Sequence, residues 1–534
     1  MAMAVSRASG TPLYQPDAGL IANVPATMVP DRACTECDNV QFFDGKIVVR
    51  PGFQVDSVLS PLIPDPTHII NHLGTMVTQA QEYFLTHVEA KGTAATVFAF
   101  STPTAGRTQI NSTLLFCDPS GQRPTSTQFK GEWLLATTGS NLQRWIGTGM
   151  LVDVSTAQTN AALQCPGNPY FVCSTASRVF VANAIDNATG LRVPWRVWYS
   201  DTLNSGVWSN GGGLPEQGSS GYQDLLHESS PIKGMIFQGG TRVVVLKAHS
   251  IYRSSWVGSP VWYDFLPISK TRGLAATHSL QEWNDILIFL GDDYNVYMLA
   301  KDNSINAVGD PIWPILRDLV NEFFSYAITS WVDHTRGLYH LIIPYNQYGV
   351  VVNKIFTLNL KTGAWGMGTL ASTSLQMASA LWYRPSPPFF LIRPISILGG
   401  TDGQIYSVDY TDHTMADGDV KFTATWWGKA QDLMALMQGK GETAEFSKAA
   451  IQGETGTAQP QIRMGKSLKE LKADAKQYRF DGMDFDAANP DAYVTKRVDA
   501  ERYGQFGIHW PLGISNPAEV QGFTAWGLPR GAAR

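Results

Sequence analysis

The sequence VVVL at residues 243–246, with the polar turn KAHS at 247–250 and then Ile251 and Tyr252, sets the pattern of this chain. A second unit at residues 286–299 repeats it, because the run ILIFL is followed by the turn GDDYN and the run VYML. Each unit is typical of a β-hairpin, since short β-branched and aromatic runs alternate with Gly, Asp and Asn turns. The runs are apolar throughout, so we expect both faces of these strands to be covered.

Similar pairs of runs continue on both sides of this stretch. The strongest signal is Asp44-Gly45, which favours the two-residue turn of a hairpin between residues 41–43 and 46–49. Further strand pairs are predicted at residues 82–88 with 96–100, 132–136 with 143–146, 178–182 with 196–201, 337–343 with 353–360, and 394–400 with 404–408. The runs recur roughly every 45–55 residues, a spacing that fits propeller blades with loop insertions. We therefore predict an all-β fold, an irregular β-propeller of six to eight blades, because a closed array leaves few exposed strand edges.

Changes in composition divide the chain into three predicted parts. Residues 1–38 are rich in Pro, Ala and Gly and predict an extended N-terminal arm. Residues 39–412 are assigned to the β-propeller, and residues 420–534 to a smaller C-terminal β-rich platform or closing domain. This last part carries more charge and less apolar periodicity than the rest.

Two segments predict helix, and the C-terminal part also predicts strands. The clearest helix is expected within residues 311–323, where Leu316, Leu319, Val320 and Phe323 have helical spacing. A short helix is predicted at residues 466–476, and strands at residues 423–427, 503–510 and 520–528.

The composition restricts the classes of partner. The chain has 534 residues, of which 16% are charged, and a formal net charge of −5. A mildly acidic chain is not built to hold nucleic acid by counterion release, although it can lie beside DNA without adhering. Residues 1–10 lack the apolar core of a secretory signal, and no apolar run reaches the ~18 residues of a membrane span.

The cysteines and histidines give weak signals for metal. Cys34 and Cys37 form half of a zinc signature, but no second pair stands at zinc-site spacing, so we interpret the five cysteines as reduced thiols. His68 and His72 could share a helix face, yet no third ligand accompanies them, and a packing role is favoured.

Other short motifs also have structural interpretations. The acidic cluster Asp481, Asp484, Asp486 and Asp491 does not have the spacing of an EF-hand loop. The sequence GKS at residues 465–467 lacks the upstream Gly of a phosphate-binding loop, because Pro460 occupies that place. Residues 198–208 look like the Asp-box hairpin of sialidase-type propellers, although Ser200 and Asp201 are adjacent rather than spaced; that box is a structural turn.

No residue is therefore nominated as catalytic, cofactor-binding or metal-ligating. No paired carboxylates can be assigned as acid and nucleophile, and no Gly-x-Ser-x-Gly elbow is present. Asp292, Asp293 and Asn295 are interpreted as turn formers. Most of the 16 tryptophans are interpreted as blade core rather than as a sugar-binding groove. We predict a protein that is not an enzyme and needs no cofactor.

The order of these features resembles the tail nozzle (tail hub) proteins of short-tailed bacteriophages. Four stretches carry the resemblance: the Asp44-Gly45 turn with the sequence RPGF at 50–53, residues 195–208, residues 232–252, and residues 339–365. The likeness spans roughly residues 40–410, while the N-terminal arm and the residues after about 420 match poorly.

The resemblance implies a structural virion protein of the phage tail. Six copies would form a homo-oligomeric ring below the head-to-tail adaptor, with tail fibres or spikes docked outside and genomic DNA crossing the channel during ejection. A mildly acidic conduit would repel the phosphate backbone. Two alternatives stay open, namely a glycan-binding or glycan-cleaving propeller that acts in receptor recognition, and a scaffold propeller for cellular partners.

Overall fold

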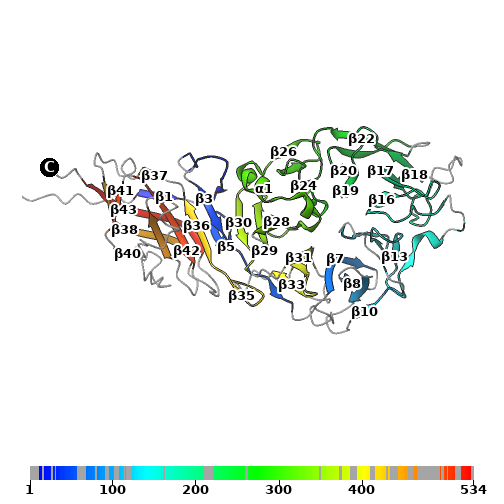
Figure 1. The fold of residues 1–534 in the computed structure, drawn as a ribbon, viewed down its shortest axis with the longest axis horizontal. Coiled ribbons are helices and arrows are strands. Elements are labelled where there is room, and N and C mark those ends of the chain that lie inside the picture. Colours follow the sequence, from blue (N-terminus) through cyan, green and yellow to red (C-terminus); the bar gives the residue numbers. More distant parts are fainter. Residues whose placement is uncertain are drawn as a thin grey trace, which may run out of the picture.

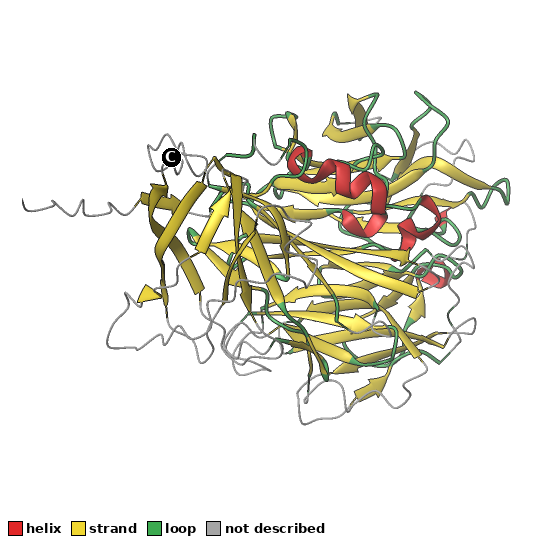
Figure 2. Ribbon diagram, turned by 60° about the vertical axis from the view of Figure 1, so that its left-hand side comes forward, coloured by secondary structure: helices red, strands yellow, loops and turns green. Residues whose placement is uncertain are grey.

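The structure is a computed structural model, and strands make up nearly all of its regular elements (Figure 2). It describes residues 11–14, 17–25, 28–30, 32–56, 68–78, 81–90, 95–100, 107–112, 115, 122–157, 159, 163–208, 220–258, 262–347, 350–371, 376–384, 394–408, 415–428, 431–432, 443–454, 461–465, 493–494, 498–501, 503–510 and 519–530. Within these residues one short α-helix and a few 3-10 turns accompany the strands. The predicted all-β class is therefore confirmed.

Most of the described strands belong to seven four-stranded antiparallel sheets (Figure 1). We number them sheets 1 to 7. They are β7–β10 (His68–Val77, Glu82–Ala90, Ala95–Phe100, Arg107–Gln109), β11–β14 (Thr125–Phe129, Glu132–Ala136, Gln143–Trp145, Val152–Asp153), β15–β18 (Phe171–Ser174, Val179–Ile185, Arg192–Tyr199, Gly221–Asp224), β19–β22 (Ile232–Gln238, Arg242–Lys247, Ile251–Trp256, Tyr263–Ser269), β23–β26 (Gln281–Trp283, Ile286–Leu290, Val296–Leu299, Ile305–Ala307), β27–β30 (Thr329–Asp333, Leu338–Gln347, Val350–Asn359, Trp365–Thr369), and β31–β33 (Met377–Tyr383, Ile395–Gly400, Ile405–Val408) with β6 (Gln54–Val55).

The predicted hairpins lie in these sheets, except the hairpin of residues 41–49, which belongs to a larger sheet described below. Strands β20 and β21 pair antiparallel around residues 247–250, and β24 and β25 pair around residues 291–295. In the second turn, the Gly291 amide donates to the Asn295 carbonyl (2.7 Å) and the Asn295 amide donates to Asp293 Oδ1 (3.1 Å). The interpretation of Asp293 and Asn295 as turn formers is confirmed.

Alternate residues of β20 pack into two different cores, as the apolar run predicted. Val243 and Val245 lie in a cluster with sheet 3, whereas Val244 and Leu246 lie in a cluster with sheet 5, and all four are fully buried. Since side chains alternate across a strand, burial of every residue requires a neighbour on each face. Sheets 7 and 1 share a core in the same way, through residues such as Ile397 and Phe84.

Sheet 7 takes its fourth strand from the opposite end of the chain. Strand β6 pairs antiparallel with β33, so that Val55 lies opposite Tyr406. A short segment near the N-terminus thus completes a sheet whose other strands come some 300 residues later in the sequence.

Two larger sheets combine strands from both ends of the chain and lie beside sheet 6, at the left of Figure 1. One contains β1 (Thr11–Tyr14), β4 (Val40–Phe43), β5 (Lys46–Val49), β38 (Thr443–Glu454), β40 (Tyr493–Val494), β41 (Val498–Glu501) and β43 (Glu519–Arg530). The other contains β2 (Gly19–Leu20), β3 (Ala33–Asp38), β36 (Ala424–Gly428), β37 (Gln431–Asp432), β39 (Gln461–Gly465) and β42 (Tyr503–Trp510). The C-terminal strands predicted at 423–427, 503–510 and 520–528 are confirmed.

Strands of the predicted N-terminal arm are paired with strands of the C-terminal part of the chain. Strand β3 pairs antiparallel with β36, and hairpin β4–β5 pairs with β43. The structure thus joins residues on both sides of the predicted boundary at 38/39 to strands of the C-terminal part, which supply hydrogen-bonding partners to their backbone groups. At Asp44-Gly45 both residues have positive φ, 50° and 72°, as the predicted turn requires.

The predicted helix is shorter than its apolar pattern. Helix α1 (Trp313–Leu319) follows the 3-10 turn η5 (Asp310–Ile312), and it buries Leu316. Val320 is extended (ψ 122°), so the prediction that the helix runs on to Phe323 is wrong, and a second 3-10 turn, η6 (Glu322–Ala327), follows. The other described helical turns are η2 (Val154–Ala157) and η4 (Thr277–Ser279). The helix predicted at 466–476 lies outside the described residues.

A buried ion pair links the N-terminal hairpin to the small hairpin β34–β35 (Ala416–Asp417, Val420–Lys421). Arg50 donates to Asp417 through Nη1 (2.8 Å) and Nη2 (2.6 Å), and both side chains are almost fully buried. Asp417 also accepts from the backbone amides of Phe53 (3.3 Å) and Ala371 (2.8 Å). We call this group the Arg50 clamp. It connects residues 50–53 to Ala371 and Asp417, which lie more than 300 residues later in the sequence.

None of the helices in the described part of the chain has the length and hydropathy that a membrane span needs.

Candidate functional site

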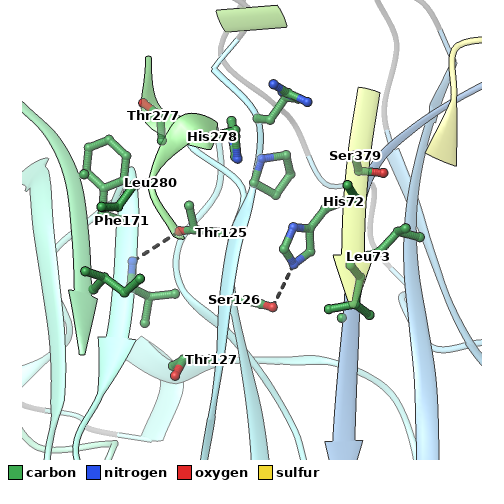
Figure 3. Close-up of a pocket in the computed structure, with 18 of the residues that line it drawn as sticks. His72, Leu73, Thr125, Ser126, Thr127, Phe171, Thr277, His278, Leu280 and Ser379 are labelled. Carbon is green, nitrogen blue, oxygen red and sulfur yellow. Dashed lines mark hydrogen bonds between the residues drawn. The ribbon is translucent and has the colours of Figure 1, made fainter. Parts of the chain in front are cut away.

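A cavity of about 490 Å³ lies between the seven sheets. Its lining comes from the first strand of sheets 1 to 4 and 6 to 7, and from η4 and the start of β23 in sheet 5. Figure 3 shows lining residues of β7, β11, β15, η4 and β31. The polar side chains that line it are Asn71, His72, Thr75, Arg123, Thr125, Ser126, Thr127, Gln128, Thr277, His278, Gln281, Thr329, Ser330 and Ser379. We call it the central cavity.

Hydrogen bonds between neighbouring first strands fix several of these side chains. Thr125 Oγ1 accepts from the Val172 amide (3.2 Å) and donates to the Tyr170 carbonyl (3.2 Å), which joins sheets 2 and 3. Ser379 Oγ donates to the Ile70 carbonyl (2.7 Å), which joins sheets 7 and 1. These hydroxyl groups hold the wall of the cavity together.

His72 and Ser126 form the one contact in the described cavity that resembles a nucleophile with its base. His72 Nε2 lies 2.7 Å from Ser126 Oγ (Figure 3). Burial lowers the pKa of His72 to about 4, and the positive charge of Arg123 acts in the same direction. A general base works best with a pKa near the operating pH, and its imidazolium form must be stabilised. The surroundings of His72 oppose that form, so we interpret this pair as a link between sheets 1 and 2.

Arg123 is buried at the edge of the central cavity and bonds only to neutral groups in the described structure. Its Nε donates to the Tyr326 carbonyl (3.0 Å), its Nη1 donates to Thr329 Oγ1 (2.7 Å), and its Nη2 donates to the Ile328 carbonyl. Only 6% of the residue is exposed. Burial lowers the pKa of Arg123 to about 9, because removal from water disfavours the charged guanidinium.

His278 lies next to Arg123 and lacks a side-chain partner. Its Nε2 is buried without a hydrogen bond in the described structure, while its backbone carbonyl accepts from Ser330 Oγ (2.7 Å). Burial lowers the pKa of His278 well below its ordinary value, and the charges of Arg123 and His72 add to this effect. The imidazole is therefore neutral at pH 7.

The described lining of the central cavity contains no Asp or Glu. Glu89 contacts the lining residue Asn71, since it accepts a hydrogen bond from Asn71 Nδ2. Retaining and inverting glycosidases need two carboxylates about 5–9.5 Å apart. The described residues supply no such pair to this cavity.

Several residues considered in the sequence are placed elsewhere. Cys34 and Cys37 are buried free thiols in β3, and burial together with the neighbouring Cys37 raises the pKa of the Cys34 thiol. His68 and His72 lie on strand β7 rather than on a helix. In the described residues no three His, Cys, Asp or Glu side chains gather as a metal site would require. The acidic cluster at 481–491 and Lys466 lie outside the described residues.

The stretch at residues 198–208 is a structural turn, as interpreted. The Asp201 amide donates to the Val207 carbonyl (2.8 Å), and Trp208 Nε1 donates to the Ser205 carbonyl (2.8 Å). The tryptophans at positions 133, 145, 198, 208, 331, 365, 426 and 427 are buried, whereas Trp256 is exposed. Most tryptophans with a described environment that lie in the sheets are therefore core or half-buried.

Sequence reasoning missed Arg123 and His278. Neither residue belongs to a motif, since Arg123 lies just before β11 and His278 lies in η4, before β23. The only local signal is the sequence QR at 122–123 within a largely uncharged segment.

Comparisons with known proteins leave the family open. No family model matches the chain, and no curated protein matches it. Among solved structures, Sqt1 of Saccharomyces cerevisiae has 9% identity, a TM-score of 0.38, and coverage of 67% of this chain and 98% of its own. The extracellular domain of a one-component system from B. thetaiotaomicron has 12% identity, a TM-score of 0.40, and coverage of 88% and 59%. An exo-beta-1,3-galactanase from Phanerochaete chrysosporium has 10% identity, a TM-score of 0.25, and coverage of 85% and 95%. These likenesses carry no functional assignment.

Proposed function

We propose that sheets 1 to 7 are the blades of a closed, seven-bladed β-propeller. Support comes from the buried cores that consecutive sheets share and from the core between sheets 7 and 1. The pairing of β6 with β33 gives further support, because a last blade completed from the other end of the chain holds a ring shut. Such closure leaves only short edges open to solvent.

We propose further that the protein acts through its shape, as a structural protein of a phage virion. In this proposal several copies, six by the resemblance, form the tail nozzle ring, which contacts the head-to-tail adaptor and tail fibres and lets DNA pass. The four stretches that carry the resemblance correspond to hairpin β4–β5 with residues 50–53, strand β17 with its following turn, strands β19–β21, and strands β28–β30.

The observation that best supports a role in assembly is a group of exposed apolar side chains. Trp256, Val257 and Leu203 are 58%, 53% and 54% exposed. The Arg178 guanidinium lies 5.7 Å from the Trp256 ring and donates through Nη2 to Thr202 Oγ1 (2.7 Å), so Arg178 connects the turn after β17 with the end of β21. Large apolar side chains that gather on a surface favour a permanent protein interface. We call Leu203, Trp256 and Val257 the apolar corner.

The test is the particle mass of the purified full chain, alone and with the proteins encoded by neighbouring genes. Mass photometry and negative-stain microscopy should detect six-fold rings, and Trp256→Glu should reduce the ring population at least several-fold. Val420→Glu is the matched control, because Val420 is also exposed (44%) but lies on β35. A monomer under every condition, including the native particle, would contradict the ring.

We do not propose glycan cleavage for the central cavity, since its described lining lacks the two carboxylates of that chemistry.

A further inference from the structure

Donor groups from two segments converge at one corner of the central cavity. One segment is residues 123–126, which line the cavity before and within β11 and follow Gln122, and the other is η4. Thr277 Oγ1 lies 3.5 Å from Gln122 Oε1, which joins the two segments, and Arg123 and His278 are the next residues along each. The charge of Arg123 reaches both His278 and His72, so the three side chains share one electrostatic environment. We call Gln122, Arg123 and His278, together with His72 of the neighbouring strand β7, the Arg123 corner.

The hydrogen-bonding capacity of this corner is not used up within the described structure. A guanidinium has five N–H donors, and the bonds to Tyr326, Thr329 and Ile328 occupy three of them. Gln122 Nε2 is buried and donates to no described acceptor, and His278 Nε2 is likewise without a partner. Buried polar groups without partners cost free energy, roughly 1–3 kcal/mol each, so a bound group that satisfied them would be held firmly.

The charge of the corner is also uncompensated. Arg123 keeps a positive charge at pH 7, and no described carboxylate contacts it or lines the cavity. A buried cation is normally paired, because its desolvation is costly. A small anion would supply the missing charge, and a planar or tetrahedral oxyanion matches the fork of a guanidinium.

We infer that the Arg123 corner is a binding site for a small oxyanion, held through a phosphate or carboxylate group by Arg123, His278 and Gln122. The cavity volume of about 490 Å³ admits a small organic anion as well as the inorganic ion. A bound anion also favours the protonated form of His72 and His278, so binding takes up protons. Besides Arg123, the charged and titratable groups that face these two imidazoles are each other, His87 on β8, and Glu89 through Asn71.

The experiment is calorimetric titration of the full chain with inorganic phosphate and, separately, with citrate, at pH 7 and constant ionic strength. We expect saturable binding of at least one anion with one site per chain, and the two titrations separate a phosphate site from a carboxylate site. Arg123→Met should weaken binding at least 10-fold. Arg317→Gln is the control, because Arg317 is exposed on α1 and the substitution removes the same charge.

A second variant keeps the test decisive if Arg123→Met does not fold. His278→Asn removes a side chain without a described partner, so the fold should persist, as size exclusion and circular dichroism will show. It should weaken binding at least 3-fold and reduce the proton uptake measured by titration in two buffers of different ionisation enthalpy. Absence of saturable binding of both anions up to millimolar concentration would overturn the site. The site would also be overturned if the wild type and His278→Asn bound the anions with equal affinity and equal proton uptake.

Discussion

Two buried arginines serve different ends in this molecule. In the Arg50 clamp, Arg50 meets a carboxylate in a two-point bond, and Asp417 also receives two backbone amides. In the Arg123 corner, the guanidinium meets two carbonyls and a hydroxyl, and its pKa is lowered by burial. A buried arginine that is paired with a carboxylate stabilises the fold. A buried arginine that lies beside a cavity and has no carboxylate partner can instead bind an anionic ligand. The same residue type therefore marks either stability or binding according to its partners.

The largest effect should come from breaking the Arg50 clamp. Arg50→Met leaves Asp417 buried and charged, and the loss of one partner of a buried pair costs about 3–5 kcal/mol of unfolding free energy. Urea unfolding followed by tryptophan fluorescence measures it. The double variant Arg50→Met with Asp417→Leu should recover part of the loss, because no charge stays buried. If Arg50→Met lowered the free energy of unfolding by less than about 1 kcal/mol, the Arg50 clamp would contribute no more than a surface ion pair.

Arg123→Met should destabilise the protein less than Arg50→Met does. The substitution leaves the Tyr326 and Ile328 carbonyls without the hydrogen bonds that Arg123 donates, which costs about 1–3 kcal/mol of unfolding free energy. It also removes a buried charge, which offsets part of this cost. The same urea titration compares the two variants. If Arg123→Met destabilised the protein as much as Arg50→Met or more, the distinction between a stabilising Arg50 and a ligand-binding Arg123 would be contradicted.

The histidines of the Arg123 corner should make stability depend on pH in a defined window. The pKa of His72 is about 4 in the folded protein and ~6.5 in the unfolded chain, so the unfolded chain binds more protons between these values. The free energy of unfolding should therefore fall as pH decreases from about 6.5 to about 4. His72→Gln should flatten this decline in part, since His87 and His278 have lowered pKa values as well. Chemical unfolding at several pH values checks it, and an unchanged slope in His72→Gln would refute it.

The smallest effect is expected at an exposed arginine. Arg32 pairs with Asp17 at the surface, where 59% of the arginine side chain is accessible. Because solvent and salt screen such pairs, Arg32→Met should change the unfolding free energy by less than about 1 kcal/mol. The change should shrink further in 1 M NaCl. A loss comparable with that of Arg50→Met would mean that burial does not set the strength of these pairs.

The sequence alone determined the local structure to a large extent. It located most hairpins, the Asp44-Gly45 turn and the burial of both faces of β20, because turn chemistry and side-chain alternation act over a few residues. It overextended the helix, since the apolar spacing through Phe323 continues after the backbone has become extended at Val320. The spacing of apolar residues does not predict that the backbone becomes extended at Val320.

Only the tertiary structure decided which distant segments meet. The pairing of β6 with β33, the joining of N-terminal and C-terminal strands, and the partner of Arg50 all cross more than 300 residues of sequence. The Arg123 corner has the same origin, because Arg123 precedes β11 of sheet 2, His278 lies in η4 before sheet 5, and the two residues share no motif. Local patterns fix what each strand is, but the charge balance of a cavity depends on which strands surround it.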